Sequence, residues 1–403
     1  MKGIVIKRVI LLVIIFNASN TYSQNKLVVF SLDANALKIN KQKVLSKDTT
    51  VMPAVKQLLK EADNALQLAP MSVMEKKNTP PSGDKHDYMS LAPYFWPDPN
   101  KPDGIPYIRK DGQVNPEVEE YKDKEYLPVL CRVINILSLA YYFTDDNKYA
   151  EKSAKLIKVW FLDSATKMNP NLNFGQAVKG VNDGRGAGII DTRSLMKVID
   201  AIGFLKGTNY WSEKDQQEMV HWFTDYLQWL RTSKNGIDEK KTKNNHAIWY
   251  DAQSLSFALF IGDTTIARDI VLNVQRRLED QMDNDGFFPA ELDRTISLHY
   301  SVFILDPLFN IAQMSSVVGI DMWNYTSKSG KSIKKAFEAL LPYISKEKDW
   351  EGQQIKPFDF QVGIPLLAQG ISKLKCITCK ESIYNIAGEK SKKLLFNLIN
   401  NID

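Results

Sequence analysis

The chain has 403 residues, of which 44% are hydrophobic and 25% are charged, and its formal net charge at pH 7 is +5. This is the composition of an ordinary globular protein with enough chain for one large domain or two modest ones. No basic run is interleaved with aromatic residues, so we predict no nucleic-acid partner. The mild positive charge suits an anionic substrate, and it suits an ordinary solvated surface at least as well.

The first residues have the pattern of a secretory signal peptide. Lys2, Lys7 and Arg8 precede an apolar run over residues 9–16, and small and polar residues follow up to Gln24. The run is too short to span a bilayer. We therefore expect residues 1–24 to be a signal peptide and residues 25–403 to be a secreted protein without membrane association, periplasmic if the host is a Gram-negative bacterium.

Apolar residues recur with helical spacing through most of the chain, and short polar turns such as "TDDN" and "GDT" join the segments in pairs. Strand-like alternation does not run through successive segments, and no Pro/Gly/Ser-rich linker divides the chain. We predict an all-α fold for residues 25–403, a single (α/α) toroid or incomplete barrel of helical hairpins. The helical segments are 51–68, 127–144, 148–162, 193–206, 213–232, 246–262 and 264–282.

Two stretches that interrupt the helices are long for loops without a function, residues 84–117 and residues 168–193. The first is rich in aromatic rings, each of which either stacks on a sugar ring or pins the loop to the core. These rings are Tyr88, Tyr94, Phe95, Trp96 and Tyr107.

The second stretch, "MNPNLNFGQAVKGVNDGRGAGIIDTR", places polar residues among glycines. Asn173, Gln176 and Arg185 are candidate ligand contacts, because glycines let the backbone approach a ligand closely. The alternative is a glycine-rich turn in which Arg185 is tied to Asp183 or Asp191.

One of the four histidines follows two asparagines at a predicted helix start, in "KTKNNHAIWYDAQ". Either Asn244 or Asn245 can cap that helix by accepting a backbone N–H. A helix start is also an anion site, because its first N–H groups have no partner within the helix.

A third cluster lies in "DGFFPAELDRTISLHYSVFILDPLFN", where Arg294, His299 and Tyr300 fall within seven residues. Adjacent helical residues diverge by about 100°, so His299 and Tyr300 cannot face one cleft in the same way. We assign Tyr300 to the cleft and His299 to a supporting or packing position. Carboxylates also gather here and leave a hydrolase open as an alternative: Asp283, Asp285, Glu291 and Asp293.

Neither the cysteines nor the acidic residues predict a metal or a cofactor. Cys376 and Cys379 lack the second pair of a zinc ribbon and are expected to form a local disulfide in an oxidising compartment, while Cys131 is expected to be a buried apolar residue. The "DNDG" at residues 283–286 resembles the start of a calcium loop, but the closing glutamate is absent, so a turn is predicted.

Four motifs together are similar to the alginate lyase superfamily of polysaccharide lyases, which includes the family 5 alginate lyases and the family 38 enzymes acting on glucuronan or alginate. They are "YMSLAPYFWPDP", "NLNFGQAVKGVNDGRGAGIIDTR", "NNHAIWYDAQ" and "ELDRTISLHYS", and the similarity runs from about Tyr88 to about Asn310. The resemblance implies an α/α toroid and an anionic polysaccharide as the partner.

The resemblance also implies roles for particular residues. Asn245 and His246 match the Asn-His pair that surrounds the uronate carboxylate, Tyr300 matches the catalytic tyrosine, and Arg294 is the nearest match to the catalytic arginine, with Arg185 as its alternative. Together with the loop residues, the motifs predict these substrate-binding residues: Asn244, Gln176, Arg185, His299, Tyr88, Tyr94, Trp96 and Trp249.

A uronan lyase removes the proton on C5, next to a carboxylate, and expels the oxygen on C4. Asn, His and Arg side chains can neutralise that carboxylate, and free N–H groups at the start of the helix would help. A tyrosine acting as base must lose its proton, so we expect its pKa of about 10 to be lowered by a neighbouring Arg or protonated His.

In glucuronate and mannuronate the C5 proton and the C4 oxygen lie on the same face of the ring, so one tyrosine can take the proton and return it. In guluronate they lie on opposite faces, and His246 would be the base. The sequence thus predicts a secreted lyase that cleaves a β-1,4-linked uronan, glucuronan or mannuronate-rich alginate, by β-elimination. An α/α-toroid glycoside hydrolase and a non-catalytic glycan-binding protein remain alternatives, and the oligomeric state is not predicted.

Overall fold

The computed structural model describes residues 27–402, so the predicted signal peptide lies outside the described residues. Helices dominate the described part of the chain. Those that position the site are α3 (Lys122–Thr144), α5 (Leu195–Leu205), α6 (Glu213–Thr232), α7 (Lys234–Lys240), α8 (Asn245–Ile261) and α11 (Ser297–Ser315). The others are α1 (Ala34–Leu45), α2 (Met52–Leu66), α4 (Asn147–Phe161), α9 (Thr264–Gln281), α10 (Pro289–Leu292), α12 (Ile333–Ile344), α13 (Ile364–Leu374), α14 (Cys379–Ala387) and α15 (Phe396–Ile399).

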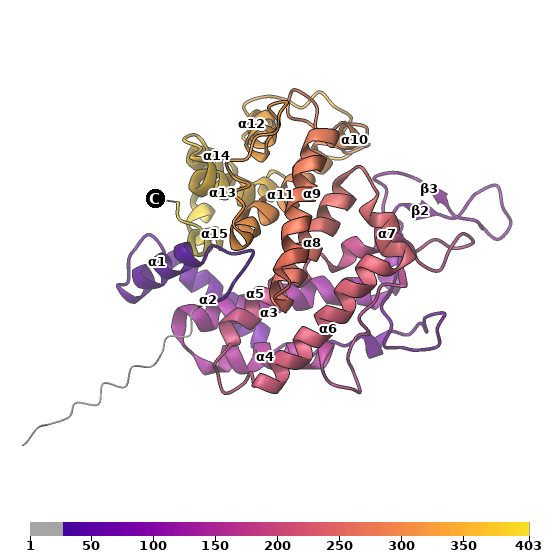
Figure 1. Cartoon of the computed structure of the whole chain (residues 1–403), viewed down its shortest axis with the longest axis horizontal. Helices are drawn as coiled ribbons and strands as arrows, with labels where there is room; N and C mark the ends of the chain where they lie inside the picture. Colours follow the sequence, from indigo (N-terminus) through magenta and orange to yellow (C-terminus); the bar gives the residue numbers. More distant parts are fainter. Residues whose placement is uncertain (1–26, 403) are drawn as a thin grey trace, which may run out of the picture.

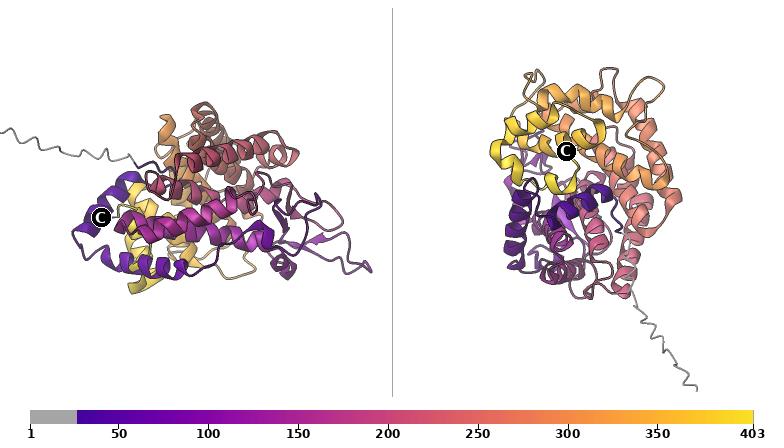
Figure 2. Two further views of the ribbon diagram at one scale, coloured as in Figure 1. Left: turned by 90° about the horizontal axis from the view of Figure 1, so that it is seen from below. Right: turned by 90° about the vertical axis from the view of Figure 1, so that its left-hand side faces the viewer.

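The helices follow one another around a ring (Figure 1; Figure 2, right). The C-terminal α15 packs against α1 and α2, which brings the two ends of the described chain together. Buried apolar side chains form one connected core that extends from Leu37 to Leu398. The arrangement confirms the predicted all-α toroid of helical hairpins.

Each predicted helical segment is a helix, and the turns between paired helices follow from their sequences. Asp145 ends α3 in the left-handed conformation (φ 56°), and the side chain of Asp146 then caps α4. Gly262 ends α8 in the same conformation (φ 82°), and the Asp263 side chain caps α9. Each pair of helices therefore reverses direction within a few residues.

Two stretches, Lys122–Thr144 and Ser297–Val318, are long and apolar enough to cross a membrane by composition alone. In each, 61% of the most apolar window is buried inside the protein, where α3 packs on α4 and α5, and α11 packs on α8. Their apolar character is accounted for by the core of the ring.

Short strands, which the sequence did not reveal, lie in the two long loops; one pair joins the loops to each other and one pair lies within the first loop. Strand β1 (Met89–Leu91) pairs in parallel with β4 (Phe174–Ala177), and β2 (Phe95–Trp96) pairs antiparallel with β3 (Ile108–Arg109). The β2–β3 arm projects from one end of the ring (Figure 1). These strands have two to four residues, too few for an alternating pattern to be seen in the sequence.

The smaller predictions about the cysteines and the "DNDG" motif are confirmed. A disulfide joins Cys376 and Cys379, whose Cα atoms are 5.5 Å apart, and Cys131 is fully buried in α3. Asp283 accepts hydrogen bonds from the backbone N–H groups of Asp285 and Phe287, so residues 283–287 form a turn.

A buried carboxylate holds the N-terminal segment on α5. Asp200 accepts hydrogen bonds from the backbone N–H groups of Phe30 (2.6 Å) and Ser31 (3.2 Å) and from the Ser31 hydroxyl. Gly203 lets the segment approach, because a Cβ there would lie 1.9 Å from the carbonyl oxygen of Val28. The start of the described chain is thus fixed by side chains one turn apart on one helix.

We expect Asp200→Asn to lower the free energy of unfolding by about 1–3 kcal/mol, because one of the two carboxylate oxygens that accept from Phe30 and Ser31 is replaced by an NH2 donor. Burial raises the pKa of Asp200 from about 3.8 to about 6. Between these values the folded protein binds more protons than the unfolded chain, so the wild type loses stability as the pH rises, and the variant does not. Urea unfolding at pH 4 and pH 7 should therefore show a smaller deficit for the variant at pH 7. A deficit that grew with pH would contradict this assignment.

Candidate active site

A cleft of about 560 Å³ lies where the two long loops meet α7, α8 and the start of α11. The structure places all four predicted catalytic residues in its wall: Asn245, His246, Arg294 and Tyr300. Five of the predicted substrate-binding residues also line the cleft: Tyr94, Gln176, Arg185, Asn244 and His299. Segments that are far apart in the sequence thus converge on one cavity.

Three predicted substrate-binding rings do not line the cleft, and the assignment is corrected for the two that are buried, Tyr88 and Trp249. Tyr88 is fully buried beneath the loop and donates a hydrogen bond to Asp191 (3.2 Å). Trp249 is 3% exposed and lines a different cavity on the inner side of the ring. Trp96 lies outside the cleft wall and donates its indole N–H to the carbonyl oxygen of Gln113 (2.9 Å). These rings pin loops or pack in the core, which was the alternative for the loop aromatics.

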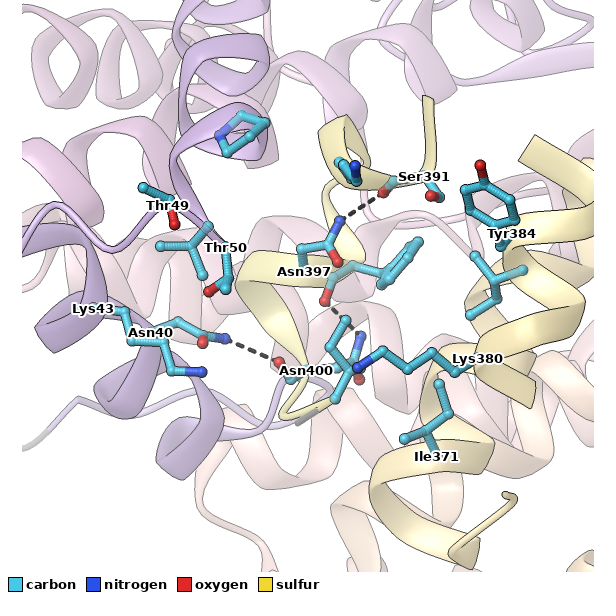
Figure 3. A pocket seen from close by; sticks show the side chains of 16 residues that line it. Asn40, Lys43, Thr49, Thr50, Ile371, Lys380, Tyr384, Ser391, Asn397 and Asn400 are labelled. Atoms are coloured by element: carbon cyan, nitrogen blue, oxygen red, sulfur yellow. Dashed lines mark hydrogen bonds between the residues drawn. The ribbon is translucent and has the colours of Figure 1, made fainter. Parts of the chain in front are cut away.

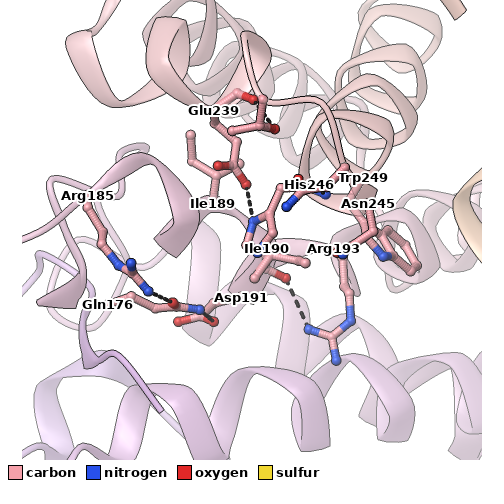
Figure 4. Close-up of polar contacts among 12 residues, drawn as sticks. Gln176, Arg185, Ile189, Ile190, Asp191, Arg193, Glu239, Asn245, His246 and Trp249 are labelled. Atoms are coloured by element: carbon pink, nitrogen blue, oxygen red, sulfur yellow. Dashed lines mark hydrogen bonds and ion pairs between the residues drawn. The ribbon is translucent and has the colours of Figure 1, made fainter. Parts of the chain in front are cut away.

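His246 is paired with a carboxylate that the sequence did not single out. Its Nδ1 lies 2.6 Å from Oε1 of Glu239 on α7 (Figure 4), and the Glu239 side chain is 2% exposed. A carboxylate is an acceptor, so Nδ1 carries a proton, and in the neutral form of the ring Nε2 keeps its lone pair. Gly186 allows this arrangement, because a Cβ there would lie 2.7 Å from the carbonyl oxygen of Asn235 and keep the second loop away from α7.

The N-terminus of α8 is already satisfied, which corrects the expectation of free N–H groups there. Asn244 is the cap, and its side-chain oxygen accepts from the backbone N–H of His246 (3.2 Å). The buried carboxylate of Glu291 accepts from the backbone N–H of Asn245 (2.5 Å) and from its side-chain Nδ2 (2.8 Å). Any neutralisation of a substrate anion must therefore come from side chains.

Tyr300 lies between a second tyrosine and an arginine. Its hydroxyl donates to the hydroxyl of Tyr94 (2.8 Å), and the guanidinium of Arg294 lies 3.6 Å from the centre of its ring. Burial raises the pKa of Tyr300 well above 10, although the charge of Arg294 acts in the opposite direction. The expected lowering of this pKa is therefore not observed, and Tyr300 is held as a phenol.

Arg294 is fixed by Asp111 from the first long loop. Its Nη2 lies 2.8 Å and its Nε 3.1 Å from the two carboxylate oxygens of Asp111, which also accepts from the hydroxyl of Thr295 (3.0 Å). Burial opposes ionisation of Asp111, but these hydrogen bonds and the Arg294 charge hold its pKa well below its usual range. The pair positions the guanidinium on the Tyr300 ring and joins the loop to the head of α11.

Gln176 links Arg185 to a buried carboxylate (Figure 4). Its Oε1 accepts from Nη2 of Arg185 (3.0 Å), and its Nε2 donates to Asp191 (3.1 Å). Gln176 has φ 49°, a costly backbone conformation for a residue with a side chain, and such strain gathers at functional sites. Arg185 is therefore linked to Asp191 through Gln176 and makes no direct ion pair with Asp183 or Asp191 within residues 27–402. Its guanidinium also lies 4.9 Å from the centre of the Phe95 ring.

The glycines of the second loop serve packing of the protein on itself. A Cβ on Gly188 would lie 2.4 Å from the carbonyl oxygen of Gly175, and one on Gly184 would lie 2.0 Å from that of Asn173. The Asn173 side chain accepts from the indole N–H of Trp229 (2.9 Å), away from the cleft. The glycines were predicted to let the backbone approach a ligand. In the structure they instead let β4 approach the turn at Gly186–Thr192.

His299 supports the site, as expected. Its ring stacks on Phe303 one helical turn later, with ring centres 6.1 Å apart. Burial lowers its pKa below 6.5, and the nearby Arg294 acts in the same direction. At neutral pH it is an uncharged residue of the cleft wall.

The charge of the cleft is positive. Its basic side chains outnumber its carboxylates, Asp191 and Glu239, and both carboxylates already have hydrogen-bond partners. Glu291 is occupied by Asn245, and none of Asp283, Asp285 and Asp293 lines the cleft in the described chain. The acid and base pair of a hydrolase is therefore not found in the predicted acidic cluster. The basic residues are Arg109, Lys124, Arg185, Arg193 and Arg294.

Sequence reasoning missed two carboxylates that hold the site, Asp111 and Glu239, and it named Glu291 only as a hydrolase candidate and not as the partner of Asn245. Glu239 lies seven residues before His246 but on a separate helix, and Asp111 is 183 residues from Arg294. Their contacts depend on how helices and loops meet, and no local spacing signals them.

A second pocket, of about 460 Å³, lies where α13 to α15 meet α1 and α2 (Figure 3). Its wall includes Lys380, Tyr384 and Asn397 but none of the predicted site residues. It contains neither a carboxylate nor a histidine, and therefore offers no counterpart to the acid–base groups of the cleft.

Comparison with known proteins agrees with this geometry. Residues 72–350 match the family model described as alginate lyase. A crystal structure of an alginate lyase from Bacteroides ovatus is 38% identical, with a TM-score of 0.87 over 93% of this chain and 99% of the other. No curated protein sequence matches significantly.

More distant structures share the fold. Alginate lyase A1-III with a histidine replaced by alanine, complexed with a tetrasaccharide, has a TM-score of 0.60 at 16% identity, over 95% of this chain and 99% of the other. Alginate lyase A1-III from Sphingomonas species A1 has a TM-score of 0.55 at 16% identity, over the same shares.

Proposed function

The chain belongs to the alginate lyase family, and we propose that this polysaccharide lyase cleaves the β-1,4-linked uronate chain of alginate by β-elimination, leaving a 4,5-unsaturated uronate end. The observation that carries the proposal is the convergence of Asn245, His246, Arg294 and Tyr300 in one positively charged cleft. Mannuronate-rich alginate is the favoured substrate. Glucuronan is the second choice, because its C5 proton and C4 oxygen also lie on the same face of the ring.

On these substrates Tyr300 is the proton carrier. As phenolate it takes the proton from C5, the C5–H electrons form the double bond, the C4–O bond breaks, and the resulting phenol returns the proton to the departing oxygen. Because burial favours the phenol, the proton of Tyr300 must first be lost. Arg294, 3.6 Å from the ring centre, favours that loss.

The substrate carboxylate gains charge as the C5 proton leaves, and donors aimed at it lower the barrier. The amide of Asn245 has a second N–H beyond the one that Glu291 accepts. Arg185 and Arg193 add positive charge to the same wall. Positive side chains on the wall also predict binding that weakens as the salt concentration rises.

The Glu239–His246 pair supports a second substrate, guluronate-rich alginate. The carboxylate orients the imidazole through Nδ1, so that Nε2 of the neutral ring can act as a general base, and Tyr300 as a phenol suits the general acid. Such a division of roles fits elimination across opposite faces of the sugar. On mannuronate and glucuronate, the sequence predicts that Tyr300 is both base and acid. On guluronate it predicts His246 as the base, and the contact with Glu239 supports that role.

Initial rates on purified polymannuronate, polyguluronate and polyglucuronate at matched ionic strength test the proposal. Elimination creates a conjugated double bond, so the products of a lyase absorb ultraviolet light. We expect such products from alginate, fastest from polymannuronate. New reducing ends without absorbance would indicate a hydrolase, and binding without cleavage of any polymer would indicate a glycan-binding protein.

Glu239→Gln is expected to lower kcat about tenfold to a hundredfold, because a charge-assisted hydrogen bond to His246 is replaced by a neutral one. The measurement is kcat and KM on polymannuronate and on polyguluronate, with a larger fall on the polymer for which His246 is the base. Asp238→Asn is the matched control, since it removes an exposed carboxylate from the same helix. Equal activity of the two variants would show that the pairing has no role in turnover.

We also propose that the protein acts after export. The signal-peptide pattern of residues 1–24 and the Cys376–Cys379 disulfide, which is typical of oxidising compartments, support this location. Mass spectrometry of the protein from the periplasm of its host should find an N-terminus near Gln24 or Asn25.

A further inference from the structure

A chamber of about 620 Å³ adjoins the cleft and shares two wall residues with it. Its wall is built by α5, α11 and α13 and by the segment around Asp33. In Figure 1 the β2–β3 arm and α7, which border the cleft, lie at one end of the molecule, and α13 and α15 lie toward the other. The chamber has the size of a small-molecule site.

A thin partition separates the chamber from the cleft. Arg193 and Phe303 line both cavities, and Trp249 lines the chamber. The guanidinium of Arg193 lies 5.6 Å from the ring centre of Phe303 and 5.9 Å from that of Trp249. The chamber therefore has aromatic surface and a cation at its inner end, which are the groups that sugars and carboxylates contact.

Polar groups in the chamber wall are left without partners. Within residues 27–402 the carboxylate of Asp306 has no hydrogen bond and no ion pair, and neither has the ammonium group of Lys197. Burial raises the pKa of Asp306, against the charges of Lys197 and Arg193. A carboxylate in such a place costs free energy unless water or a ligand satisfies it.

The wall also supplies neutral hydrogen-bonding groups. The side-chain amides of Asn135 and Gln369 face the chamber without a hydrogen bond to the described chain, and Asn310 uses its Nδ2 but not its Oδ1. Amides and a carboxylate suit hydroxyl groups, while Lys197 and Arg193 suit an anionic group. The combination differs from the pocket of Figure 3, whose wall has lysines and amides but no carboxylate.

We propose that this chamber binds a small sugar acid of one or two uronate rings, with its carboxylate at Lys197 and Arg193 and its hydroxyl groups at Asp306 and the amides. The inference rests on the proposed function for the choice of a uronate, since short uronates are what a uronan lyase releases. It concerns a different cavity from the one where the chain is cut, although Arg193 and Phe303 line both.

Isothermal titration calorimetry with D-mannuronate, which contains no bond to cleave, tests the proposal. We expect Lys197→Met to weaken the chamber affinity at least tenfold and Lys197→Arg to retain it. Lys380→Met is the matched control, because it removes the same charge from the wall of the other pocket and should change the affinity less than twofold. His246→Ala, a change in the cleft, should leave the affinity of a site in the chamber unchanged. D-mannose should not bind.

Identical titrations for Lys197→Met and Lys380→Met would overturn the proposal, as would the loss of all binding in His246→Ala. Thermal unfolding of each variant shows whether the fold is retained, and Lys197 is exposed, so little change is expected. Polymer cleavage is measured separately. If the protein binds mannuronate in the chamber but cleaves no uronan, the proposed function is wrong and the binding site stands. If it cleaves uronans but does not bind mannuronate in the chamber, the binding site is wrong and the proposed function stands.

Discussion

Tyr300→Phe is expected to lower kcat by about 10²- to 10⁴-fold, the range that one proton-transferring side chain contributes. The ring stays, and with it the contact of Arg294 with its face, so binding should be nearly unchanged. Only the hydroxyl that carries the proton is lost, together with its hydrogen bond to Tyr94. Steady-state rates on polymannuronate and the Kd of a tetramannuronate separate these two effects.

Tyr94→Phe is the matched control for that experiment. It removes the other hydroxyl of the same hydrogen bond and leaves Tyr300 able to carry a proton, so we expect a loss of about tenfold or less. If Tyr300→Phe kept more than a few per cent of the wild-type rate, Tyr300 would not be the acid–base residue. A similar large loss in both variants would indicate that the pair of hydroxyls acts as a unit.

Asn245→Ala is expected to lower kcat about 10²- to 10³-fold, the effect of losing one preorganised donor to a developing anion. The residue is buried in the cleft wall, where its amide is held by Glu291. The substrate carboxylate gains charge during the reaction, so the loss should fall on kcat more than on KM. Kinetics on polymannuronate at fixed ionic strength measure this difference.

Loss of the amide also leaves Glu291 with one donor fewer, and a second variant separates this effect. Adding Glu291→Gln to Asn245→Ala removes the buried charge. If the double variant regained wild-type turnover, Asn245 would act by satisfying Glu291 and not by contacting substrate. Circular dichroism and thermal unfolding of both variants show whether the start of α8 is retained.

The sequence by itself determined the helical ring and the motifs whose residues line the cleft. Helical periodicity reports which face of a segment is buried, and each predicted segment is a helix because the apolar residues are spaced for it. The Asn-His and His-Tyr motifs could be found because each lies within one short stretch at the head of α8 or α11. A local pattern suffices where the chemistry uses neighbouring residues.

Only the tertiary structure decided which groups support those residues and which rings face the cleft. Glu239, Glu291 and Asp111 meet His246, Asn245 and Arg294 across separate elements, and such contacts leave no spacing in the sequence. Tyr88 and Tyr94 lie six residues apart in one loop, yet one is buried on Asp191 and the other meets Tyr300.

The protonation of Tyr300 also follows from the tertiary structure. A nearby arginine lowers the pKa of a phenol, and burial raises it; the sequence shows that Arg294 is near but does not show how deeply the ring is buried. Desolvation depends on everything packed around the group, from segments up to 206 residues away. For this reason residue identity was predictable from the sequence, whereas the electrostatic state of the site was set by the fold.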